Sequence, residues 1–153
     1  MLASRLALMA ALLSLPIRAL AAEMAVSPEQ MCLHADLVVI AEGTSSETLW
    51  TEGPRGGIET RVWLAVHEAV RGTAPPAVEV VLPGGERGGV RHWVEDVPVL
   101  GLDRTYLLFL SRDGEAWRTV AGQQAAILVQ RHPKEPWPSV EEALGSLGAC
   151  LGR

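Results

Sequence analysis

The 153-residue sequence is poor in several residue types, and each shortage excludes something. It contains no asparagine, so it has no N-glycosylation sequon. Aromatic residues make up 5% of the chain, which leaves valine, leucine and isoleucine to fill a core. Lys134 is the single lysine, and 13 basic residues stand against 18 acidic ones, for a net charge of -5. An acidic surface repels phosphate backbones, so we expect no nucleic-acid partner.

Metal-binding and zinc-protease patterns are also missing. His67-Glu68 begins like the zinc-protease motif, but Arg71 stands where the second histidine is required. The segment also alternates like a strand, whereas that motif needs a helix. The alternative is a Cys/His metal site that draws on Cys32, His34, His92 and His132, and such a site needs three or four convergent ligands. We expect no bound metal and no cofactor.

Nucleophilic catalysis has no complete signature either. No serine lies in a Gly-x-Ser-x-Gly turn, and the spacing of His92, Asp96 and Ser111 does not predict that they meet. The glycine-rich stretch 84–89 lacks the Lys-Ser/Thr ending of a phosphate loop, so it is interpreted as a hairpin-like connection. We therefore expect that the protein is not an enzyme.

The longest apolar run lies near the N-terminus. Residues 1–5 give a positive start, residues 6–15 are apolar or small, and Ala19 and Ala21 place small residues at the two positions that a signal peptidase reads. This order is typical of a secretory signal peptide, so we expect residues 1–21 to be cleaved off after Ala21 and residues 22–153 to form one domain. The alternative, a retained anchor, is disfavoured because spanning a bilayer takes about 20 apolar residues.

The signal predicts a periplasmic or secreted protein with no stable membrane anchor after cleavage. Loss of Arg5 and Arg18 leaves 11 basic against 18 acidic residues, a net charge of -7. Both cysteines, Cys32 and Cys150, remain in the mature chain and meet an oxidising compartment. We expect them to form one disulfide that joins the first mature element to the last; the alternative is two buried free thiols.

Alternation and turn residues predict a mainly β domain. Helices are expected at 28–35, capped by Ser27, and at 139–151, capped by Ser139. The predicted strands cover 37–41, 58–70, 78–82, 90–97, 104–110, 117–120 and 125–130. The polar stretch 44–57 is expected to be a loop that contains a turn at 53–57. No helix separates the strands, which favours antiparallel pairing in a closed or nearly closed sheet.

The pattern of strands and turns is similar to that of a group of known proteins. The segments that carry the likeness are 35–43, 66–72, 78–85, 106–110, 117–122 and the region of Gln124. They resemble a group of small exported bacterial proteins with an OB-like barrel, related in shape to netrin-like and tissue-inhibitor-of-metalloproteinase (TIMP) domains. The resemblance implies an OB-like (TIMP/netrin-like) antiparallel β-barrel of about six or seven strands, flanked by short N- and C-terminal helices.

The inhibitor mechanism of the metalloproteinase inhibitors does not carry over with the fold. Those proteins place an N-terminal cysteine on the target zinc, whereas residues 23–31 precede Cys32 here. An inhibitor of a secreted protease therefore remains an alternative by fold analogy alone. A small hydrolase or metal enzyme with a site assembled from scattered residues is a third class of function.

A cluster of Arg87, Arg91, His92 and Trp93 beside a glycine-rich loop is the candidate binding surface. Arginine and tryptophan are residue types that anchor protein interfaces, and OB-type barrels bind through loops and neighbouring strands. We expect a non-catalytic binding or accessory module that engages an exported protein. The alternative for this segment is a solvated loop with Trp93 folded back onto the barrel.

Overall fold

The structure, a computed structural model, describes residues 25–52, 56–130 and 134–151. The predicted signal peptide with its cleavage site lies outside the described residues, as do residues 53–55 of the predicted turn and His132. The described elements are α1 (Pro28–His34), β1 (Leu37–Trp50), β2 (Ile58–Arg71), β3 (Ala77–Pro83), β4 (Gly85–Arg87), β5 (Val90–His92), β6 (Thr105–Asp113), β7 (Ala116–Thr119), η1 (Gly122–Ala125), β8 (Ala126–Leu128), α2 (Val140–Gly145) and η2 (Gly148–Leu151). The protein is mainly β, as expected.

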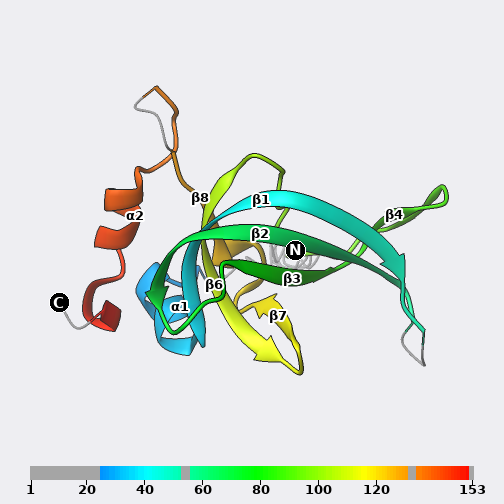
Figure 1. The fold of residues 1–153 in the computed structure, drawn as a ribbon, viewed down its shortest axis with the longest axis horizontal. Helices are drawn as coiled ribbons and strands as arrows, with labels where there is room; N and C mark the ends of the chain where they lie inside the picture. The colour runs from blue at the N-terminus through cyan, green and yellow to red at the C-terminus, as the bar shows by residue number, and fades with distance from the viewer. Residues whose placement is uncertain (1–24, 53–55, 131–133, 152–153) are drawn as a thin grey trace, which may run out of the picture.

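Six strands form one sheet in the order β1-β2-β3-β7-β6-β8, and β6 also pairs with β1. The pairing therefore passes from β1 through β2, β3, β7 and β6 and returns to β1 (Figure 1). All of these pairings are antiparallel except β3 with β7, which are parallel at Val80 and Trp117. The expectation of wholly antiparallel pairing was wrong at this one junction, because five strands in a closed circuit cannot alternate in direction at every contact.

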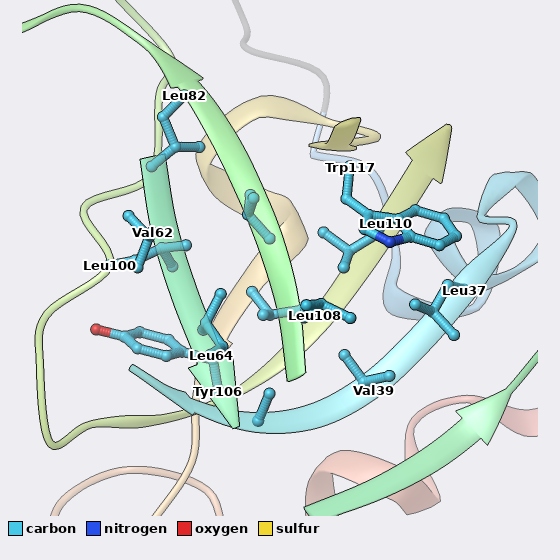
Figure 2. Close-up of a cluster of buried hydrophobic side chains, with 13 residues drawn as sticks. Leu37, Val39, Val62, Leu64, Leu82, Leu100, Tyr106, Leu108, Leu110 and Trp117 are labelled. Atoms are coloured by element: carbon cyan, nitrogen blue, oxygen red, sulfur yellow. The ribbon is translucent and has the colours of Figure 1, made fainter. Parts of the chain in front are cut away.

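Two buried clusters lie on opposite faces of β1 and β6. Side chains inside the circuit of strands point toward one another, and Figure 2 shows Leu37, Leu64, Leu108 and Trp117 among them. Alternate residues of the same strands, such as Val38 in β1, pack instead with α1 and α2. Residues 37–41 are apolar at every position because both faces of the strand are covered.

Both helices begin where their capping residues predicted. Ser27 and Ser139 each form a capping box with the residue three positions later, Gln30 and Glu142 respectively. The second helix is shorter than expected, because α2 ends at Gly145 and a separate 3-10 turn, η2, follows. The predicted disulfide is confirmed: Cys32 in α1 and Cys150 in η2 are joined, with their Cα atoms 6.0 Å apart.

Several strand boundaries differ from the sequence prediction: β6 continues to Asp113, and β4 is a short strand within the stretch 84–89 that was expected to be a connection. β1 continues through the stretch expected to be a loop and pairs with β2 as far as Trp50 and Ile58. Residues 44–47 are exposed, so this half of β1 needs no apolar pattern. β5 ends at His92 instead of residue 97, because the chain turns at Asp96 with φ 56°. β8 covers only Ala126–Leu128, because η1 takes in Ala125 and Gln130 bridges instead to Ser139.

Removing the disulfide is expected to lower the free energy of unfolding. The bond joins residues 118 positions apart, and the chain-entropy model gives about 4–5 kcal/mol as the upper value for so long a loop. The double variant Cys32→Ala/Cys150→Ala should unfold at lower urea concentration than the oxidised wild type. Reductant should shift the wild type toward the variant and leave the variant unchanged. Equal midpoints for the oxidised wild type and the variant would contradict this.

Candidate functional site

The β4–β5 hairpin packs against β1 and β2, at the opposite end of the molecule from α2 (Figure 1). The Thr60 hydroxyl donates a hydrogen bond to the carbonyl oxygen of Gly84 at 2.8 Å, and the Gly84 amide donates to Ile58 O at 2.7 Å. Gly85 has φ 132°, and a Cβ there would meet Thr60 Oγ1 at 2.4 Å. Only glycine fits this position, and the two hydrogen bonds at Gly84 attach the base of the hairpin to β2.

The four predicted surface residues all belong to this hairpin or follow it. Arg87 ends β4, Arg91 and His92 lie in β5, and Trp93 comes directly after. All four are exposed, and Trp93 has 77% of its surface accessible. Trp93 is therefore not folded back onto the sheet, which was the alternative for this segment.

The two arginines of the cluster have different surroundings. Arg91 donates through Nε and Nη2 to the same oxygen of Glu86, at 3.0 and 2.7 Å, across the hairpin. Arg87 donates through Nη1 to the main-chain carbonyl of Thr48 in β1. The charge of Arg91 is thus balanced within the hairpin, and Arg87 links the hairpin to β1.

A concavity of about 410 Å³ lies between the hairpin and the sheet. Arg91, His92 and Trp93 line it, whereas Arg87 does not. Four of the other lining residues are apolar and buried in the sheet or in the loop after the hairpin: Val62, Leu82, Pro98 and Leu100. The concavity therefore has an apolar floor and a rim of polar and aromatic side chains, as small binding sites commonly have.

The loop from Trp93 to Leu100 separates this concavity from a second one of about 540 Å³. The carboxylate of Asp96 accepts a hydrogen bond from the Gln123 amide at 3.1 Å, which ties the loop to η1. Gly101, just beyond the loop, donates its amide to the Tyr106 hydroxyl at 2.7 Å. Between these attachments Val99 is 83% exposed, so the loop presents a second apolar side chain beside Trp93.

The other residues considered from the sequence do not assemble into a site. His67 contacts Glu42, with Nε2 and Oε2 3.1 Å apart, on the exposed part of the sheet. No group of three or more potential metal-ligating side chains occurs among the described residues. In the same part of the chain, no hydrogen bond joins any two of His92, Asp96 and Ser111. No described helix is long and apolar enough to cross a membrane.

Sequence reasoning found the exposed cluster but missed its apolar floor and the exposed Val99. Val62 and Leu82 looked like ordinary core residues of two strands, and no pattern marks them as lining a concavity. Two further tryptophans lie in β1 and β2: Trp50 is 55% exposed and Trp63 is half-buried. Comparisons with models of known protein families and with curated proteins yield no match for this chain.

Thr60→Val is expected to loosen the hairpin while leaving the sheet folded. The change keeps the shape of the side chain but removes the donor to Gly84 O, at a cost of about 1 kcal/mol. Amides of residues 85–92 should exchange with solvent faster, as measured by hydrogen exchange. Thr44→Val is the matched control, because Thr44 donates to Trp63 O at 2.9 Å away from the hairpin. Unchanged exchange of the hairpin amides in Thr60→Val would show that this bond does not hold the hairpin.

Proposed function

We propose that this protein is a non-catalytic binding or accessory module that engages another exported protein. Its contact surface is the hairpin surface, defined as Arg87, Arg91, His92 and Trp93. The observation that carries the proposal is the 77% exposure of Trp93 at the rim of an apolar-floored concavity. A tryptophan held in water at such a position gains most when a partner covers it.

Rigid support of the hairpin surface favours binding. The Thr60–Gly84 hydrogen bond fixes the base of the hairpin, and the Asp96–Gln123 hydrogen bond fixes the loop that follows. Trp93 lies between these two attachments. A surface that is already ordered loses less conformational entropy on association, which leaves more of the contact energy as affinity.

We further propose that the fold is an OB-like barrel of the TIMP/netrin-like kind. The circular pairing β1-β2-β3-β7-β6-β1 supports this, together with helices that cover one side of the sheet. Export to the periplasm or the medium is part of the same proposal. The signal-like residues 1–21 and the Cys32–Cys150 disulfide support it, because disulfides persist in oxidising compartments.

Trp93→Ala is expected to reduce partner recovery by about tenfold or more, which is the effect of losing an interface anchor. The measurement is crosslinked affinity capture of the exported, tagged protein from its native periplasm and medium, quantified by mass spectrometry. Trp137→Ala is the matched control, because Trp137 is 43% exposed and lines neither concavity beside the hairpin.

The triple variant Arg87→Ala/Arg91→Ala/Trp93→Ala extends this test to the hairpin surface as a whole. It should recover no partner above an untagged control if these side chains make the contact. Equal recovery by the triple variant and the wild type would show that the hairpin surface is not where the partner binds.

A further inference from the structure

The outer half of β1 has a neighbour on only one side. Its pairing with β6 runs from Leu37 to Glu42, and a single bridge from Gly43 to Leu102 follows. Its pairing with β2 continues to Trp50. Figure 1 shows β1 and β2 continuing together toward the hairpin end of the molecule. Within the described residues, the other edge of β1 has no strand beside it from Ser45 to Trp50.

Hydrogen-bond alternation fixes which main-chain groups face that open edge. The Thr51 amide donates to Gly57 O at 2.8 Å, so residues 51 and 57 are a hydrogen-bonded pair of the β1–β2 ribbon. Such pairs alternate with non-bonded pairs in antiparallel strands, so Thr48 opposite Thr60 is a non-bonded pair. The amide and carbonyl groups of Ser46, Thr48 and Trp50 therefore point away from β2.

The contact made by Arg87 supports this assignment independently. Its guanidinium donates to the carbonyl oxygen of Thr48, which requires that oxygen to face away from the β1–β2 ladder. Arg87 is exposed, so its side chain can be exchanged for another donor without disturbing the core. A side chain of the hairpin surface thus occupies one acceptor of the open edge.

We propose that this open edge, residues 46–50 of β1, binds an extended segment of the partner protein as an added strand. The outward amides and carbonyls of this edge are spaced two residues apart, so they can form main-chain hydrogen bonds with another strand. The proposal rests on the proposed function, since it specifies how the exported partner is held.

The adjoining concavity explains how the open edge prefers some partner sequences over others. Residues opposite each other on paired strands project on the same face. Ser46 lines the 410 Å³ concavity together with Val62 and Leu82. A partner residue opposite Ser46 would therefore direct its side chain toward the apolar floor, and Trp93 stands at the rim. The segment is expected to be extended and to carry an apolar side chain at that position.

Charge favours a different protein over a second copy as the occupant. The chain has a net charge of -5, so two copies repel each other, and Glu47 is exposed within the edge itself. An extended segment of another protein need not carry the same negative charge, so this repulsion does not apply to it.

The probe for this proposal is a displayed library of random 12-residue peptides, selected against protein purified after export of the full chain. Thr48→Pro removes the outward amide but none of the amides used in pairing with β2, and proline is tolerated on edge strands. Selected peptides should bind Thr48→Pro about tenfold or more weakly than the wild type. Thr48→Ala is the matched control, because it keeps the main-chain amide and should change affinity less than threefold.

A second measurement does not depend on how well the proline variant folds. N-methylation of alternate amides along a selected peptide should abolish binding, whereas methylation of the intervening amides should not, because only alternate amides face β1. Absence of this alternation, equal binding to Thr48→Pro, or failure to enrich any peptide over that variant would overturn strand addition. A wild-type dimer that Thr48→Pro converts to monomer would overturn the assignment of the occupant to another protein.

Partner capture by Trp93→Ala and by Thr48→Pro distinguishes a failure of strand addition from a failure of the proposed function. If Trp93→Ala abolishes partner capture while Thr48→Pro retains it, the hairpin surface binds the partner without an added strand. If both variants capture the partner like the wild type, the proposed function itself is wrong.

Discussion

The pairing of β1 with β6 is the constraint on which the rest of the structure depends. Residues 37–42 of β1 and their partners, residues 105–110 of β6, are apolar at nearly every position. Both faces of this pair of strands are covered. One face joins the cluster inside the circuit of strands, and the other packs with the two helices. The disulfide and the two capped helices stabilise the second of these faces. Damage to this pair would open both clusters at once, because each contains alternate residues of the same two strands.

This arrangement also explains why the candidate site lies where it does. Both faces of β1 are covered in the half that pairs with β6, and the other half continues with β2 alone and is exposed at residues 44–47. The β4–β5 hairpin packs against these two strands and leaves Trp93 in solvent beside an apolar floor. The proposed contact surface therefore lies away from the β1–β6 pair, on exposed side chains that can vary with little effect on stability.

Several features of the site were accessible from residue types, and others were not. Arg87, Arg91, His92 and Trp93 stood out because such residues cluster rarely on an acidic chain, and all four are exposed. Their partners were not predictable, because Glu86 and Thr48 give no local signal of pairing with an arginine. The concavity was likewise hidden, since its floor comes from strands distant in sequence.

The sequence by itself determined the local elements: the helix starts at Ser27 and Ser139, the apolar strands and the single disulfide. The helix starts and the apolar strands depend on residues close together in the chain. The disulfide was predictable because the chain has two cysteines, which can form one pair. Tertiary structure alone decided the length of β1, the early end of β5 and the parallel contact between β3 and β7. A polar strand becomes a strand only when a neighbour supplies its hydrogen bonds, and that neighbour is chosen by the packing of the whole sheet.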